Sequence, residues 1–146
     1  MAAEQLSQGY SGDLSAAEAW ALLSRDPTAQ VVDVRTAAEW TFVGLPDLTA
    51  LGRKLHCLEW QSFPAMDRNP DFVAQAAAAL GGKKDAPVLF LCRSGARSRA
   101  AAMAMTSAGY TNCLNVAGGF EGDLDQERRR GHRNGWKAAG LPWKQT

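Results

Sequence analysis

A cysteine followed by a short polar loop is the feature of this chain with the clearest chemical potential. Cys92 ends the apolar run of residues 87–91, and the following residues read Arg-Ser-Gly-Ala-Arg-Ser. An Ala- and Met-rich helical pattern then covers residues 97–108. The order strand, cysteine, turn and helix places a thiol beside backbone N–H groups and a helix N-terminus, which stabilise a thiolate and bind small anions. The stretch therefore predicts cysteine chemistry on a sulfur- or phosphorus-centred oxyanion.

The loop residues supply charge, a turn and hydroxyl groups. Arg93 and Arg97 bring positive charge, and Gly95 lets the backbone turn its N–H groups inward, because glycine adopts positive φ without a Cβ clash. Ser94 and Ser98 are able to donate hydrogen bonds to an anion or to cap the next helix. A buried cysteine that ends a strand is, by itself, most often an inert core residue. The arginines and the glycine reverse that expectation here.

Two reaction classes fit such a loop, and arginine spacing separates them. Phosphate chemistry needs an arginine clamp on the phosphate oxygens and an acid for the leaving alkoxide. Its pattern places an arginine after five intervening residues, where this chain has Ser98, between Arg97 and Arg99. In sulfur transfer the thiolate takes the outer sulfur of a donor such as thiosulfate, and sulfite leaves without a general acid. The spacing favours a persulfide on Cys92, with a small phosphatase or arsenate reductase as the alternative.

The overall composition excludes few functions but indicates the cellular compartment. The chain has 146 residues, 46% of them hydrophobic and 21% charged, and a net charge of +1, which gives no whole-chain argument for binding nucleic acid or membrane. Cys57, Cys92 and Cys113 form no CxxC pair and no zinc-ligand spacing, so we expect reduced thiols, no metal site and a cytoplasmic location. No signal peptide is recognisable, and no run approaches the ~18 apolar residues of a membrane span.

Short apolar runs alternate with helical patterns along the chain. Strands are predicted over 31–34, 54–58, 87–91 and 112–116, and helices over 16–23, 69–80 and 97–108, with a helical turn over 36–40. The alternation predicts an α/β fold with a mainly parallel sheet, in which ligands bind beyond the carboxyl ends of the strands. Cys92 occupies such a position. We expect a flexible N-terminus over 1–11 and a single domain over 12–146.

Four segments of the chain resemble the rhodanese-like sulfurtransferases and keep that family's order. Residues 92–98 look like its active-site loop, and 31–40, with V-V-D-V-R and E-W, resemble a second signature. Residues 118–120 and 135–143 are similar to a third signature and to the C-terminal segment. The resemblance covers residues 12 to 143. It implies a parallel five-stranded sheet with helices on both faces and no metal or organic cofactor.

The resemblance also implies roles for the loop. Cys92 would be the catalytic nucleophile and would carry the sulfur of a thiosulfate:cyanide-type sulfurtransferase. Substrate binding would fall to the six residues after it, namely Arg93, Ser94, Gly95, Ala96, Arg97 and Ser98. The implied partners are a small anionic sulfur donor and a thiol or cyanide acceptor, with a protein sulfur-relay partner as an option. Family members often carry a histidine where residues 44–48 read G-L-P-D-L, so this loop is expected to alter access or partner choice.

For several other polar residues a structural role is favoured over a functional one. Arg35 and Glu39 are predicted to form an i, i+4 ion pair that holds the turn after a strand. Cys113 begins a strand, so it should lie at the edge of the sheet opposite Cys92. Cys57 is predicted to pack in the core, with a sulfur-relay role as the alternative.

Two further features have weaker signals. Trp60 follows a predicted strand, where it is a candidate wall of the pocket. Between residues 125 and 137 five basic residues stand against two acidic ones. A solvated face or a set of ion pairs is the favoured interpretation of that segment, ahead of contact with RNA or a protein partner.

Overall fold

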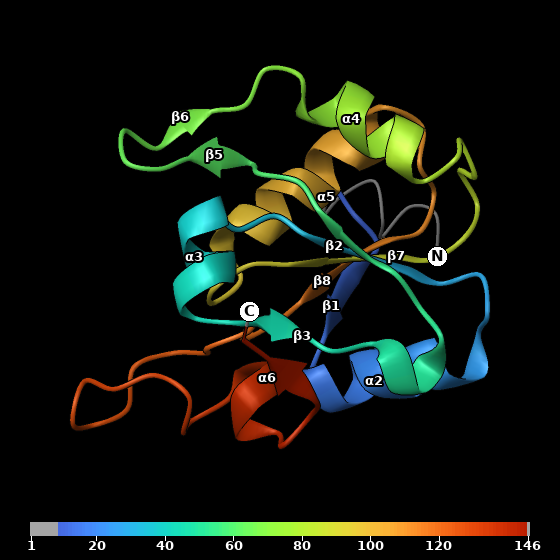
Figure 1. The fold of residues 1–146 in the computed structure, drawn as a ribbon. Coiled ribbons are helices and arrows are strands. Elements are labelled where there is room, and N and C mark those ends of the chain that lie inside the picture. The colour runs from blue at the N-terminus through green and yellow to red at the C-terminus, as the bar shows by residue number, and fades with distance from the viewer. Residues whose placement is uncertain (1–8, 146) are drawn as a thin grey trace.

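The computed structural model describes residues 9–145, which form a five-stranded parallel sheet covered by helices on both faces (Figure 1). The strands are β1 (Gly12–Leu14), β2 (Gln30–Asp33), β3 (Leu45–Pro46), β4 (Leu55–Cys57), β5 (Gln61–Ser62), β6 (Asp67–Arg68), β7 (Val88–Leu91), β8 (Cys113–Val116) and β9 (Trp143–Lys144). The central sheet has the order β1-β8-β7-β2-β4, and all its neighbouring pairs are parallel. This confirms the predicted fold class.

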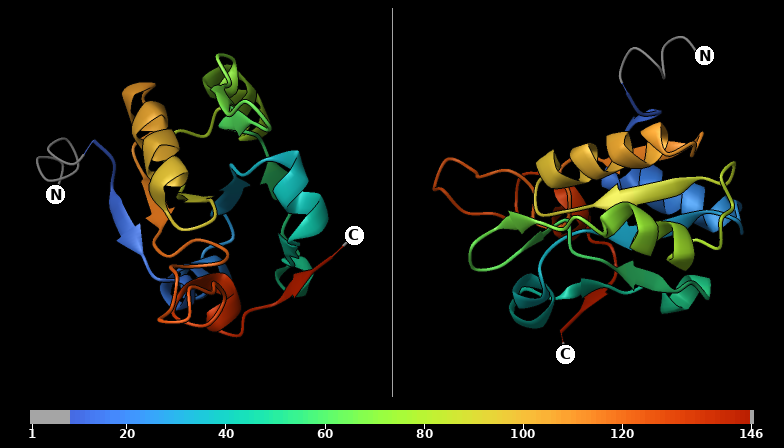
Figure 2. Two further views of the ribbon diagram at one scale, coloured as in Figure 1. Left: turned by 90° about the vertical axis from the view of Figure 1, so that its left-hand side faces the viewer. Right: turned by 90° about the horizontal axis from the view of Figure 1, so that it is seen from above.

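Helices cover both sides of the sheet. They are α2 (Ala16–Arg25), α3 (Ala37–Phe42), α4 (Phe72–Ala79), α5 (Ala96–Ser107) and α6 (Gly135–Ala138), with a 3₁₀ turn over Thr49–Leu51. Figure 2 shows α4 and α5 on one side of the sheet and α2 and α6 on the other. Each side has its own buried apolar cluster. No helix within residues 9–145 is both long enough and apolar enough to span a membrane.

Strand β7 directs the cysteine toward one of these two layers. All four of its residues are buried, as expected for a central parallel strand covered on both faces. Because strand side chains alternate, Phe90 and Cys92 belong to the cluster under α4 and α5, whereas Leu89 and Leu91 belong to the cluster on the α2 side. The thiol therefore emerges at the carboxyl end of β7 on the α5 side.

Local signals explain the helix starts next to the sheet. Ser15 and Glu18 form a capping box at the start of α2, with the Glu18 N–H donating to the Ser15 hydroxyl. Thr36 and Glu39 form a second capping box at α3, which follows β2 directly. Both boxes satisfy free N–H groups of a first helical turn and fix where the chain leaves the sheet edge.

Several parts of the chain differ from the sequence expectation, among them the N-terminus and the segment after β4. Residues 1–8 of the segment predicted to be flexible lie outside the described residues, but Tyr10 is buried and the Ser11 N–H donates to the Cys113 carbonyl at 2.8 Å, so packing begins before residue 12. The antiparallel pair β5–β6 was not predicted, and it projects beyond the sheet next to α3 (Figure 1).

Candidate active site

The loop after β7 wraps around the Cys92 sulfur at the start of α5. Gly95 is the N-cap of α5 and has φ 122, in the region that favours glycine, so its N–H turns inward. That N–H donates to the Cys92 Sγ at 3.1 Å, and the Ser98 hydroxyl lies 3.2 Å from the same sulfur. Cys92 is only 1% exposed. The sulfur therefore sits at the base of the site with polar donors on its protein side.

Ser98 connects this sulfur to a buried hydrogen-bond chain. Its hydroxyl lies 2.6 Å from the Asn115 Oδ1, and the Asn115 Nδ2 donates to the Asp13 Oδ1 at 2.9 Å. A hydroxyl has one proton, and an amide oxygen accepts only, so Ser98 donates to Asn115 when the cysteine is a neutral thiol. The Gly95 N–H is then the donor that always faces the sulfur, and Ser98 is free to turn toward a thiolate.

A glycine segment holds the loop from behind. The Phe120 N–H donates to the Cys92 carbonyl at 2.8 Å, and the Glu121 N–H donates to the Arg93 carbonyl at 3.0 Å. Gly119 has φ +61, and a Cβ there would lie 2.6 Å from the Arg93 carbonyl oxygen and closer still to that of Cys92. With these carbonyls bonded on the outside, the loop N–H groups remain available on the inside. The third segment of the family resemblance thus has a direct structural role.

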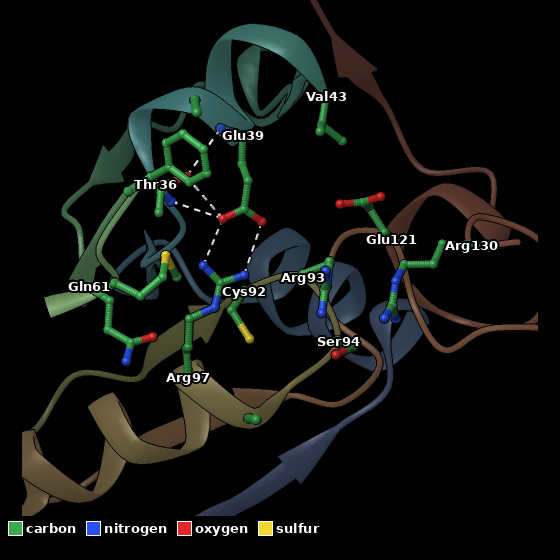
Figure 3. Close-up of a pocket in the computed structure, with 14 residues that line it drawn as sticks. Thr36, Glu39, Val43, Gln61, Cys92, Arg93, Ser94, Arg97, Glu121 and Arg130 are labelled. Atoms are coloured by element: carbon green, nitrogen blue, oxygen red, sulfur yellow. Dashed lines mark hydrogen bonds and ion pairs between the residues drawn. The ribbon is translucent and has the colours of Figure 1, made fainter. Parts of the chain in front are cut away.

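The cysteine opens into a cavity of about 640 Å³ at the carboxyl edge of the sheet. Its lining comes from α3, the β5–β6 hairpin and the cysteine loop, together with Glu121 and Arg130. Five of the predicted site residues line it: Cys92, Arg93, Ser94, Ala96 and Arg97. Gly95 and Ser98 lie behind them as buried residues. Figure 3 shows Arg97 and Glu39 on one side of the Cys92 sulfur and Arg93 and Arg130 on the other.

Arg97 is held by a carboxylate rather than left open. Its two terminal nitrogens donate to the two Glu39 carboxylate oxygens at 2.7 and 3.0 Å, as the dashed lines in Figure 3 mark. Burial raises the pKa of Glu39, but the Arg97 guanidinium and the Thr36 N–H outweigh it, and the net pKa is lowered. Such a bidentate, charge-assisted pair fixes both side chains. Arg97 therefore lines the cavity as half of an ion pair that joins α5 to α3.

The predicted pair between Arg35 and Glu39 is wrong, although Arg35 is structural. Arg35 is fully buried and donates to the Asp33 carboxylate, with an Nη2 to Oδ2 distance of 2.7 Å, and to the Gly44 carbonyl at 2.8 Å. Its guanidinium also lies 4.3 Å from the Phe120 ring centroid. A buried cation needs a buried anion, which Asp33 supplies and the more exposed Glu39 does not.

The other two thiols differ from Cys92. Cys113 begins β8, at the opposite edge of the sheet as predicted, and burial raises the pKa of its thiol to about 11. Cys57 ends β4 and is exposed, so its predicted place in the core is wrong. Although part of the residue is exposed, desolvation by the surrounding protein, followed by the charge of Asp33, raises the pKa of the Cys57 thiol to about 11.

Several site residues were missed from the sequence. Phe63, Met66, Glu121 and Arg130 line the cavity, yet none belongs to a motif. Trp60 is not a cavity wall: it is buried against Phe72, with ring centroids 5.1 Å apart. Of the basic segment, Arg130 reaches the cavity, whereas Arg128, Arg129 and Arg133 are exposed. Within residues 9–145, no group of three or more His, Cys, Asp or Glu side chains has an arrangement that would hold a metal ion.

Residues 11–146 match the model of the family described as STR4 middle domain. The chain belongs to this family. An uncharacterized protein of Rickettsia rickettsii, the RP600 homolog, is 38% identical over 131 residues, which are 90% of this chain and 95% of that protein. The chloroplastic protein THYLAKOID RHODANESE-LIKE of Oryza sativa subsp. indica is 27% identical over 132 residues, which are 90% of this chain but 25% of that protein.

Solved structures show the same fold. The crystal structure of Rv0390 from M. tuberculosis has a TM-score of 0.82 and 47% identity, covering 94% of this chain and 99% of that one. The solution structure of the polysulfide-sulfur transferase homodimer from Wolinella succinogenes has a TM-score of 0.59 and 21% identity, covering 98% of this chain and 86% of that one. The second likeness shows a shared fold, and the first shows a closer match, in both identity and TM-score, over 94% of this chain.

Proposed function

We propose that this protein is a rhodanese-like sulfurtransferase that carries a sulfane sulfur as a persulfide on Cys92. The observation that carries the proposal is the contact of the Cys92 Sγ with the Gly95 N–H, at the base of a cavity that Arg93, Arg97 and Arg130 also line. Backbone N–H groups and arginines favour an anionic sulfur and an anionic donor. The names of the rice relative and of the Wolinella fold neighbour agree with this chemistry.

The reaction proceeds in two balanced steps. The Cys92 thiolate attacks the outer sulfur of thiosulfate, a new sulfur–sulfur bond forms to Sγ, and sulfite leaves with the electron pair of the broken bond. An acceptor, either a thiol or cyanide, then attacks the outer sulfur of the persulfide. The Cys92 thiolate leaves and is ready for the next cycle. Neither step needs a general acid, because sulfite and the thiolate are stable leaving groups.

The position of Arg97 supports sulfur transfer over phosphate transfer. A thiol-dependent phosphatase needs an arginine free to clamp the transferring phosphoryl oxygens. Here both terminal nitrogens of Arg97 are bound by Glu39, and Ser98 stands where that pattern has its arginine. A phosphate group would have to displace a carboxylate to be clamped, whereas a sulfane sulfur needs only access to Cys92.

The test is to incubate the reduced protein with thiosulfate, record its intact mass, and then add cyanide and assay thiocyanate. We expect a gain of one sulfur atom, its loss on addition of cyanide, and neither change in Cys92→Ser. Hydrolysis of p-nitrophenyl phosphate by the same preparation is the contrasting assay. Phosphate release that depends on Cys92, without any sulfur uptake, would overturn the proposal and favour the phosphatase alternative.

A further inference from the structure

Two large apolar side chains of the β5–β6 hairpin border the cavity and remain open to solvent. Phe63 is 63% exposed and Met66 is 37% exposed. Ala38 and Val43, from α3 and its C-cap, add further apolar atoms to the cavity lining, with Val43 on the side of Glu121 (Figure 3). Apolar surface that gathers at a cavity is a mark of a ligand that covers it. The hairpin side of the cavity therefore suits an organic group rather than a small inorganic anion.

The backbone at Met66 supports the same conclusion. Met66 has φ 58, and its N–H donates to the Ser62 carbonyl at 2.7 Å. Glycine or asparagine fills this left-handed conformation at lower cost, since a long side chain with a Cβ is disfavoured there. Strained residues of this kind gather at ligand sites. A flexible thioether is thus kept at the cavity wall against the backbone preference.

The opposite wall is charged. Arg93 and Arg130 line it together with Glu121, and Arg130 is fixed by its Nη1 donating to the Gly122 carbonyl at 2.6 Å. Among the residues that the structure describes, no carboxylate forms an ion pair with Arg93. The cavity thus has an apolar wall and a cationic wall, with the Cys92 sulfur at the base. Its volume of about 640 Å³ falls in the range of sites for drug-sized organic ligands.

We propose that the sulfur acceptor is an organic thiol that joins an apolar body of aromatic size to an anionic group. The apolar body packs on Phe63 and Met66, the anionic group faces Arg93 and Arg130, and the thiol reaches the outer sulfur on Cys92. This inference rests on the sulfur transfer proposed above and specifies its acceptor. Phe63 and Met66 are then specificity-determining residues of the second step.

The step balances without any further reactant. The acceptor thiolate attacks the outer sulfur of the Cys92 persulfide, and a sulfur–sulfur bond forms on the acceptor. The bond between that sulfur and the Cys92 Sγ breaks, and its electron pair stays on Sγ as the thiolate. The proton that the acceptor thiol loses as it attacks goes to the transferred sulfur, so the products are an organic persulfide and the free Cys92 thiolate.

The experiment isolates this step. The full chain is loaded with thiosulfate, freed of excess donor, and mixed with one acceptor at a time, and loss of the extra sulfur is followed by intact mass. The acceptors are 2-mercapto-3-phenylpropanoate and 2-mercaptopropanoate, which differ only in the phenyl group. We expect a second-order rate constant about ten-fold higher for the phenyl acid, because the phenyl group buries apolar surface on the hairpin.

Two phenylalanine variants test the residue assignment. Phe63→Ala is expected to reduce the ratio of the two rate constants to about two or less, because Phe63 is the largest and most exposed apolar side chain of the hairpin at the cavity. Phe42→Ala is the matched control, since Phe42 is 78% exposed and lies outside the cavity, and it should keep the wild-type ratio. A third acceptor, 2-phenylethanethiol, lacks the carboxylate and should react more slowly than the phenyl acid at equal thiolate concentration.

The outcomes separate the two proposals. Failure to load sulfur on Cys92 would overturn the proposed function, and this inference with it. Normal loading followed by equal rate constants for the two acids, or a ratio unchanged in Phe63→Ala, would overturn only the inference. In that case the exposed hairpin side chains would point to docking of a partner protein.

Discussion

Cys92 and Cys57 lie at the same edge of the sheet, on strands that flank β2, and they differ in almost everything else. The register aligns Cys57 with Asp33 and Asp33 with Leu91, so Cys57 lies on the same face as Leu91. Cys92, one residue later, lies on the other face under α5. The sheet separates the two sulfurs, which argues against a sulfur relay between them.

The surroundings of the two thiols explain which one is suited to chemistry. Cys92 has the Gly95 N–H at 3.1 Å and the start of a 12-residue helix beside it. Cys57 has the Asp33 carboxylate nearby and a thiol pKa raised to about 11, which keeps it protonated at neutral pH. A position at the carboxyl edge of the sheet is therefore not sufficient to suit a cysteine to chemistry. The turn and the helix that follow the strand make the difference.

The contrast between the two thiols would be wrong if Cys57 proved as necessary for sulfur transfer as Cys92. We expect Cys92→Ser to lose sulfur transfer completely, whereas Cys57→Ser and Cys113→Ser keep most of it, because neither of those thiols faces the cavity. The measurement is thiocyanate formation from thiosulfate and cyanide for all three variants. Loss of activity in a folded Cys57→Ser protein would show a two-thiol mechanism and contradict this account.

The pH dependence of alkylation tests the other side of this contrast, the raised pKa of the Cys57 thiol. In Cys92→Ser, labelling of Cys57 by iodoacetamide should rise about ten-fold per pH unit from pH 7 to 9, since only the thiolate reacts and its pKa is about 11. Cys113 is fully buried and should label only on unfolding. Mass spectrometry of the peptides assigns the sites. A labelling rate of Cys57 that levels off below pH 9 would contradict the raised pKa.

On the Cys92 side of the sheet, the ion pair between α3 and α5 is expected to contribute to the stability of the folded protein. Glu39→Gln removes one partner of Arg97, and we expect a loss of about 1–2 kcal/mol in the free energy of unfolding near neutral pH, measured with urea. Because the folded pKa of Glu39 is lowered, its stabilisation is present above the unfolded pKa and is lost as the pH falls through the folded value. The two proteins should therefore converge in stability in acid.

A matched control comes from an exposed ion pair. Glu127 lies 3.4 Å from Arg129, and both side chains are more than two-thirds exposed. Glu127→Gln should change the free energy of unfolding by less than about 0.5 kcal/mol. An equal effect of the two substitutions would mean that the Glu39 pair is no stronger than an ordinary surface pair.

The sequence alone predicts the helices and strands whose own residues form a clear pattern. Residues 88–91 form a continuous apolar run, and the cysteine loop is followed by a helix of good helix formers, so β7 and α5 were both predicted. Strand β1 was not predicted, because its three residues, G-D-L, have no alternation and are ordered by pairing with β8. Pairing across the sheet is a property that a local pattern does not contain.

Partners distant in sequence explain the errors at the site. The i, i+4 rule joined Glu39 to Arg35, but the actual partner, Arg97, lies 58 residues away. Phe63 and Met66 had no recognisable pattern either, because they are exposed and only the fold brings the hairpin to the cysteine. The cysteine loop was recognisable because its function depends on consecutive backbone groups.

The smallest expected effect comes from removing one of the two donors that face the Cys92 sulfur, the Gly95 N–H and the Ser98 hydroxyl. Ser98 must leave Asn115 to donate to a thiolate, so its net contribution is that of one exchanged hydrogen bond, about 1 kcal/mol. Ser98→Ala should slow persulfide formation from thiosulfate about five-fold, and Ser98→Thr, which keeps the hydroxyl, should restore most of the rate. Rapid quench followed by intact mass measures both. If Ser98→Ala reacted at the wild-type rate, the Gly95 N–H and the helix terminus would suffice for the thiolate, and the hydroxyl would serve only to bind Asn115.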